Sequence, residues 1–155
     1  MKKLMLCILF ATLILGCSTK YQPHGLSGGY SDTRLASNIF NVSFAGNGYT
    51  SRERSSDFAL LRAAELTMEN GFAYFLILDT ENYTNTYTTG KTYQTAGTYN
   101  SYSFNATTRQ TGGVTFNKPR SKFQIICFKE KPNANGIAYE AQYVASSIRS
   151  KYNIN

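Results

Sequence analysis

A long apolar helix pattern enclosed between two strand patterns constrains the fold of this chain more than any other feature. Residues 39–45, IFNVSFA, alternate apolar and polar side chains, which indicates a half-buried strand. Residues 51–69 place apolar side chains around most of the helical circumference, which indicates a helix lying close against a sheet. Its polar stripe, which we expect to be exposed, consists of Arg62, Glu65 and Glu69. The continuous apolar run FAYFLILDT then predicts a strand that is buried on both faces or lies at the centre of the sheet.

Residues typical of helix ends mark both ends of this helix. Thr50 and Glu53 have the spacing of a capping box, so we expect Thr50 to be the N-cap. Asn70-Gly71 should end the helix, because glycine adopts the left-handed conformation there without steric cost. A strand, a helix and a strand in so short a span predict a βαβ-type unit or two strands joined by a helical crossover.

The rest of the chain adds a polar arm, a strand and a second helix. Residues 81–117 are almost wholly Thr, Tyr, Asn, Ser and Gly, which predicts a β-ribbon or loop arm with a mobile tip at residues 90–113. RSKFQIICFK predicts a strand, and residues 137–152 predict an amphipathic C-terminal helix. We therefore expect an α+β fold: a small two-layer domain with a mostly antiparallel sheet of about four strands, one buried helix and the C-terminal helix.

The turn Gly46-Asn47-Gly48 stands where a phosphate-binding loop would stand. A dinucleotide loop needs a third glycine, where this chain has Ser51, and the Gly-Lys-Ser/Thr ending of a P-loop is absent. His24 is the single histidine, so a Ser-His or Cys-His pair lacks its base and a His/Cys metal site lacks its ligands. We expect a structural corner here, and we expect no catalytic residue, no cofactor and no metal.

The N-terminus has the pattern of a secretory signal peptide. Two lysines precede an uncharged apolar run at residues 4–15, which is too short to span a bilayer as a helix. The sequence ILGC, which ends at Cys17, resembles a bacterial lipobox. The resemblance implies cleavage after Gly16 and acylation of Cys17 by fatty chains such as palmitate. By resemblance to the sorting rule of enteric bacteria, Ser18 in the second mature position implies the outer membrane, with the protein facing the periplasm.

This reading divides the chain into three parts. Residues 1–16 form the signal peptide, residues 17–29 the lipidated cysteine and a flexible tether, and residues 30–155 a single α+β domain. Cys127 lies within an apolar strand pattern, which favours a buried, inert thiol. The formal charge of +7 is scattered along the chain, which favours non-specific attraction to membranes or wall polymers and argues against nucleic acid as a partner.

Three short motifs carry a resemblance to other proteins. They are GYSDTRL at residues 29–35, GNGY at residues 46–49 and RAAEL at residues 62–66. In these motifs the chain resembles an uncharacterised family of short bacterial lipoproteins, whereas the Thr/Tyr arm matches that family poorly. The resemblance implies a location and a fold, but it implies no ligand and no catalytic residue.

The tyrosine-rich arm is the exposed feature with binding potential, since tyrosine buries a large area at small entropic cost. The candidate binding surface consists of Tyr83, Tyr87, Tyr93, Tyr99 and Tyr102. We expect a non-enzymatic, lipid-anchored envelope protein whose partners are the membrane and another envelope protein or a cell-wall polymer. The alternatives are an arm that is only a soluble ribbon, and an envelope glycan hydrolase that uses a carboxylate pair including Asp79 or Glu81.

Overall fold

A computed structural model describes residues 18–90, 92–100, 103–134 and 136–155. Its elements, in chain order, are β1 (Gly29–Arg34), β2 (Ile39–Ala45), α2 (Arg52–Glu69), β3 (Tyr74–Thr89), β4 (Thr92–Asn100), β5 (Ser103–Thr111), β6 (Val114–Phe128), β7 (Tyr139–Glu140) and α3 (Ala141–Tyr152). Five strands form one antiparallel sheet in the order β1-β2-β6-β3-β7, and β4 pairs with β5 in a separate two-stranded sheet. The expected small α+β domain is confirmed, with five strands in the main sheet in place of about four.

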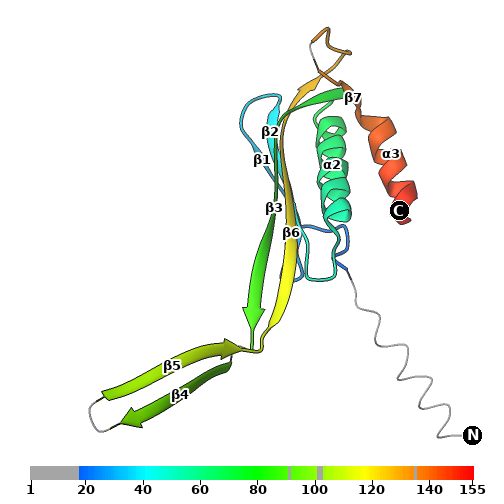
Figure 1. The fold of residues 1–155 in the computed structure, drawn as a ribbon. Coiled ribbons are helices and arrows are strands. Elements are labelled where there is room, and N and C mark those ends of the chain that lie inside the picture. The colour runs from blue at the N-terminus through cyan, green and yellow to red at the C-terminus, as the bar shows by residue number, and fades with distance from the viewer. Residues whose placement is uncertain (1–17, 91, 101–102, 135) are drawn as a thin grey trace, which may run out of the picture.

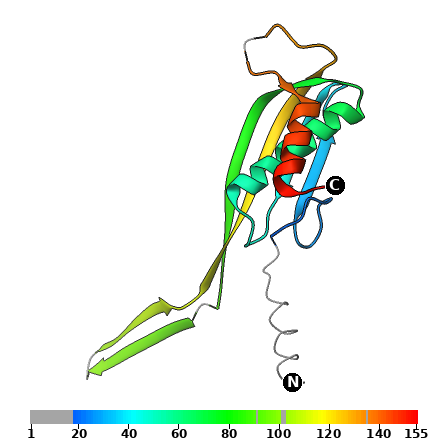
Figure 2. The same ribbon diagram turned by 90° about the vertical axis from the view of Figure 1, so that its right-hand side faces the viewer.

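Helix α2 forms a split crossover, because it connects two parallel strands that are separated by a third strand of the sheet. Both β2 and β3 run antiparallel to β6, which lies between them, so β2 and β3 are parallel to each other. Helix α2 joins them and covers one face of the sheet, and α3 packs on the side of α2 that faces away from the sheet (Figures 1 and 2). Neither of the two described helices lies on the other face of the sheet.

The core lies between this sheet and α2. Alternate residues of the strands point toward the helix and are almost fully buried, among them Phe40, Val42, Phe44, Phe75, Phe123, Ile125 and Cys127. The alanines of α2 let the helix approach the strands closely, and Phe58 and Leu61 fill the space between them. The Cys127 thiol is buried, and burial raises its pKa although its hydrogen bond with Thr67 opposes the shift.

Helix α2 begins one residue later than the capping-box spacing predicts. Ser51 is the N-cap, and its side-chain oxygen accepts a hydrogen bond from the Arg54 amide at 3.0 Å. The expectation of Thr50 as N-cap is therefore wrong, because the Thr50 hydroxyl bonds Thr19 and Asn47. The C-terminal end agrees with the sequence, since Gly71 takes the left-handed conformation with φ of +76°.

Residues 18–29 differ from the expected flexible tether, because they pack against the domain. Thr19 is 2% exposed, and its amide donates to the Thr50 hydroxyl at 3.0 Å. Gly28 has φ of +95°, and a Cβ there would lie 2.1 Å from the carbonyl oxygen of Ala45. The Tyr21 ring packs edge-on against Phe58 with centroids 5.5 Å apart. The domain thus extends back to Thr19 and does not begin at residue 30.

The polar arm is a β-ribbon, one of the two forms expected. Strands β3 and β6 stay in register from Tyr83 opposite Arg120 to Thr89 opposite Val114. Beyond the end of β2 they have no other neighbour among the described strands, so residues 84–89 and 114–119 form a two-stranded extension, which we call the ribbon. The β4–β5 sheet follows the ribbon (Figure 1).

The C-terminal helix is shorter than predicted. It begins at Ala141, whereas the sequence pattern suggested residue 137. Tyr139 and Glu140 pair with β3 as the edge strand β7, and the Tyr139 ring stacks on Phe75 at 5.3 Å. This edge pairing competes with the first helical turn, and Ile137 is left exposed. The predicted inner face is otherwise confirmed, since Ala141, Ala145 and Ile148 are buried.

Candidate functional site

The ribbon and the neighbouring end of the sheet present aromatic and basic side chains on the sheet face that α2 leaves open. Directly opposed residues of an antiparallel pair share a face, which places Tyr87 beside Phe116 and Tyr83 beside Arg120. The two tyrosines are about half exposed, at 47% for Tyr83 and 48% for Tyr87. The Lys118 ammonium lies 4.8 Å from the centre of the Tyr87 ring, a cation–π contact.

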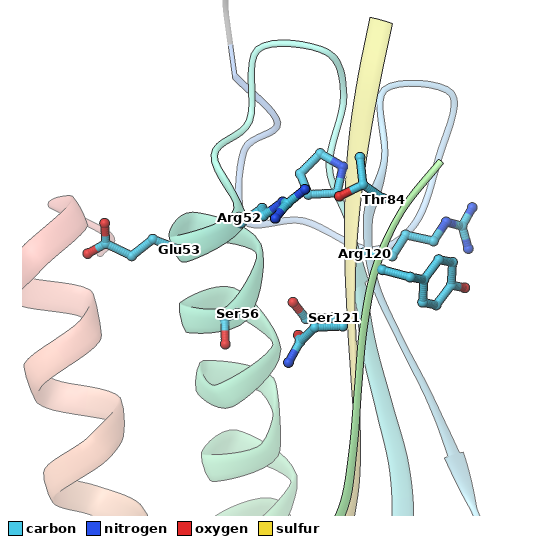
Figure 3. Close-up of a pocket in the computed structure, with 9 residues that line it drawn as sticks. Arg52, Glu53, Ser56, Thr84, Arg120 and Ser121 are labelled. Atoms are coloured by element: carbon cyan, nitrogen blue, oxygen red, sulfur yellow. The ribbon is translucent and has the colours of Figure 1, made fainter. Parts of the chain in front are cut away.

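A hollow of about 390 Å³ lies where the ribbon leaves the domain, between the first turn of α2 and the strands. Figure 3 shows Arg52 reaching from α2 toward the strands and Ser121 pointing from β6 toward the helix, while Arg120 points to the opposite side of the sheet. Strands β3 and β6 contribute most of the lining, and they also carry the exposed tyrosines. The hollow therefore adjoins the base of the ribbon.

A second hollow, of about 180 Å³, lies at the base of the ribbon on the open face. It is lined by the loop at residues 24–28, the turn at residues 45–47 and the ribbon side chains Tyr87 and Lys118. Leu26 in this loop is fully exposed to solvent. The base of the ribbon is thus surrounded by loops that the N-terminal segment and the Gly-Asn-Gly corner supply.

The structure describes part of the binding surface predicted from sequence. Tyr83 and Tyr87 lie in β3 and point to the open face as described. Tyr93 and Tyr99 have described backbones in β4, opposite Gln110 and Phe104, but their side chains lie outside the described part of the chain. Tyr102 and Cys17 also lie outside the described residues.

Asp79 and Glu81, the carboxylates of the alternative enzyme hypothesis, lie on the open face of the sheet. A register shift between Ile77 and Asp79 places Asp79 opposite Gln124 and Glu81 opposite Lys122. They line a shallow hollow of about 190 Å³, and the Glu81 carboxylate accepts a hydrogen bond from Lys122 at 3.1 Å. The two carboxylates therefore share a face, but Glu81 is already ion-paired.

The Gly-Asn-Gly corner is packed against its neighbours. The Gly46 amide donates to the Pro119 carbonyl at 2.8 Å, and a Cβ on Gly46 would lie 2.7 Å from the Thr50 Cβ. The Asn47 side chain accepts a hydrogen bond from the Tyr49 amide at 3.0 Å. These contacts give the glycine and the asparagine structural roles, as the sequence predicted for this corner.

Sequence reasoning missed a charged network that the motif residues build. Glu65 was expected on an exposed stripe, but it is only 8% exposed and accepts hydrogen bonds from Arg149 at 2.8 Å and from the Tyr21 hydroxyl. Arg62 donates to Asp32 at 2.9 Å and stacks over the Tyr30 ring at 4.8 Å. The GYSDTRL and RAAEL motifs therefore contact each other, and no local pattern in either one indicates this.

Burial and charge shift the pKa values of this network in directions that hold it together. Burial raises the pKa of Tyr21, and the neighbouring Glu65 carboxylate raises it further. Burial lowers the pKa of Arg62, but the hydrogen bonds to Glu69 and Asp32 outweigh this effect and raise it overall. Both shifts are upward, so they favour the protonated Tyr21 hydroxyl and the charged Arg62 guanidinium.

Among residues 18–90, 92–100, 103–134 and 136–155, no cluster of His, Cys, Asp and Glu has an arrangement that could hold a metal ion. Within the same residues, neither helix combines the length and the apolar character needed to cross a bilayer. Comparisons of the chain with protein families, with curated proteins and with solved structures found no match.

Proposed function

We propose that this chain is a lipid-anchored bacterial envelope protein with a non-enzymatic binding or structural role, held through Cys17 at the outer membrane and facing the periplasm. The proposal rests first on the lipobox-like sequence ILGC. Two or more acyl chains on one residue hold a protein on a bilayer, whereas a single chain binds only marginally.

The position of the first described residues supports an anchor at this point. Thr19 is hydrogen-bonded through its amide to Thr50, and through its hydroxyl to the Ser27 carbonyl at 2.7 Å and the Asn47 amide at 2.8 Å. The folded domain therefore begins two residues after the cysteine. The expected cleavage after Gly16 would therefore remove the signal peptide and leave the folded domain intact, which supports a mature chain that begins at Cys17.

The exposed aromatic ribbon is the observation that carries the binding role. Tyr83, Tyr87 and Phe116 are 40% exposed or more, although aromatic side chains of this size normally contribute to the core. Tyr87 and Phe116 lie on the ribbon beyond the sheet, and Tyr83 lies where the ribbon begins, so we expect these side chains to add little to the stability of the domain. A surface of tyrosines with adjacent lysine and arginine is typical of interfaces with proteins and polymers.

A second candidate function, hydrolysis of an envelope glycan, has one observation in its favour. Asp79 and Glu81 share the open face of the sheet beside a hollow. A glycosidase needs one carboxylic acid and one carboxylate at a defined separation across a substrate. Purified protein that cleaves a glycan, and that loses this activity in the variant Asp79→Asn with Glu81→Gln, would favour this candidate over the binding role.

Acylation in cells tests the proposed anchor. The variant Cys17→Ala should incorporate no labelled palmitate and should leave the outer-membrane fraction. Cys7→Ala is the matched control, because it changes a cysteine within the segment that we expect to be removed. Labelling of the Cys17→Ala variant at the level of the control would overturn the anchor.

A further inference from the structure

The contacts of the N-terminal segment leave no flexible linker between the domain and the anchor proposed at Cys17. The Ser18 hydroxyl accepts a hydrogen bond from the Arg54 guanidinium, and Thr19 is buried. Consecutive Cα atoms are only about 3.8 Å apart. An acylated Cys17 would therefore hold this end of the domain directly at the bilayer surface. This step rests on the proposed function.

The ribbon leaves the domain at this same end. Residues 18–20 lie beside the first turn of α2, and strands β3 and β6 run past that end and away from the core (Figures 1 and 2). At about 3.3 Å per residue, the segment at residues 84–89 extends roughly 20 Å beyond the sheet. With no tether to raise the domain, we expect this extension to come close to the bilayer.

We propose that the base of the ribbon is a second membrane contact, which lies in the headgroup layer of an anionic bilayer. The contact surface consists of Leu26, Tyr49, Tyr87, Val114, Phe116 and Lys118, all of them exposed. We call it the interfacial surface. The turn that carries Tyr49 touches the ribbon, since a Cβ on Gly48 would lie 3.5 Å from the Phe116 ring.

The chemistry of the interfacial surface fits the headgroup layer better than water. Tyrosine places its apolar ring toward the acyl chains and its hydroxyl toward water, which is why it gathers at membrane interfaces. The Lys118 ammonium beside the Tyr87 ring supplies a cation for lipid phosphates. Arg52 and Lys20 add exposed cations at the same end of the domain. Charge and aromatic character thus point to the same anionic surface.

The backbone sets the depth of this contact. In the ribbon, β3 and β6 pair only with each other among the described strands, so each has an outer edge without a neighbouring strand. Unpaired amides and carbonyls are costly within hydrocarbon, so an open ribbon cannot enter the bilayer core. The polar side chains of Asn85 and Asn117 add to this restriction. The ribbon therefore lies along the headgroups and does not span the bilayer.

Single tryptophans can test this contact, because the chain contains none. Phe116→Trp and Tyr87→Trp place reporters within the interfacial surface, and having two guards against the failure of either variant to fold. Tyr143→Trp is the matched control, because Tyr143 is 72% exposed and lies in the first turn of α3, which begins at the end of the domain away from the ribbon (Figure 1). Each full-length variant is purified from membranes and reconstituted in vesicles of phosphatidylcholine and phosphatidylglycerol.

We expect lipids with brominated acyl chains to quench the reporters at 116 and 87 several-fold more than the reporter at 143. Equal quenching at all three positions would overturn the proposal. A second result would also overturn the proposal: a photo-crosslinker at position 116 captures an envelope protein in cells, and the reporters stay unquenched. The ribbon would then bind a protein and not the bilayer. Mass spectrometry of the same preparations shows whether Cys17 carries lipid. A protein without lipid on Cys17 would count against the proposed anchor, whereas a lipidated protein with unquenched reporters would count against the ribbon contact alone.

Discussion

The Thr50 hydroxyl accepts a hydrogen bond from the Thr19 amide at 3.0 Å, although 31 residues separate the two threonines. The two hydroxyls also lie 3.1 Å apart, and both bond the Asn47 amide. This buried cluster joins the segment after Cys17 to the turn that precedes α2. Because the cluster is buried, an unmatched donor or acceptor there would be costly.

Replacing the hydroxyl of Thr19 should therefore destabilise the domain. Thr19→Val keeps the shape of the side chain but leaves the Ser27 carbonyl and the neighbouring hydroxyl without their partner. We expect a loss of about 1–3 kcal/mol in the free energy of unfolding, measured with urea. Thr33→Val on the exposed strand β1 is the control and should change stability by no more than about 0.5 kcal/mol. Equal effects would mean that residues 18–20 are loosely held.

Stability should fall at alkaline pH through Tyr21. The folded protein raises the pKa of Tyr21 above its ordinary value of 10.0, so above pH 10 the unfolded chain releases a proton that the folded chain retains. The free energy of unfolding should then decrease by about 1.4 kcal/mol per pH unit from this residue. Tyr21→Phe should remove that part of the slope, in urea titrations at several pH values above 9. Parallel curves for both proteins would contradict this prediction.

The two arginines that contact Glu65 should contribute unequally. The Arg62 side chain is 13% exposed and also pairs with Asp32 and Glu69, whereas Arg149 is 44% exposed and water screens its charge. We expect Arg62→Met to cost about 2 kcal/mol or more, and Arg149→Met less than about 1 kcal/mol. Thermal and urea unfolding of both variants measure the difference. The opposite order would mean that the contact of Glu65 with Arg149 of α3 contributes more to stability than the contacts of Arg62, which include Asp32 of β1.

The arm beyond the ribbon should add little to stability. Thr89 and Val114 are directly paired, so the two-residue turn Asn-Gly can join them in place of residues 90–113. The shortened protein should match the full chain within about 1 kcal/mol, because the core residues whose burial the structure describes all lie outside this segment. A loss of several kcal/mol in urea unfolding would mean that the β4–β5 sheet packs on the domain.

Local patterns predicted the elements that bury apolar faces. The alternation in residues 39–45 matched β2, and the nearly all-round apolar pattern matched α2 and its end at Gly71. These features depend on residues close together in the chain, so their periodicity survives in the sequence. The period-two pattern of Tyr83 and Tyr87 likewise indicated an extended ribbon, although not its length or its direction from the domain.

Features set by distant contacts could not be read locally. Residues 18–29 contain Pro and Gly and look like a linker, but Thr19 finds its partners at Ser27, Asn47 and Thr50. Glu65 lies at a position that the helical pattern assigns to solvent, and α3 and Tyr21 cover it. The interfacial surface has the same origin, because it depends on the Tyr49 turn and the ribbon meeting at one end of the domain.

Intact mass spectrometry of the protein purified from bacterial membranes tests the central claim most directly. The account predicts a mature chain that begins at Cys17 and carries the added mass of a diacylglycerol and an amide-linked acyl chain. A mature chain that begins at another residue, or an unmodified Cys17, would contradict it.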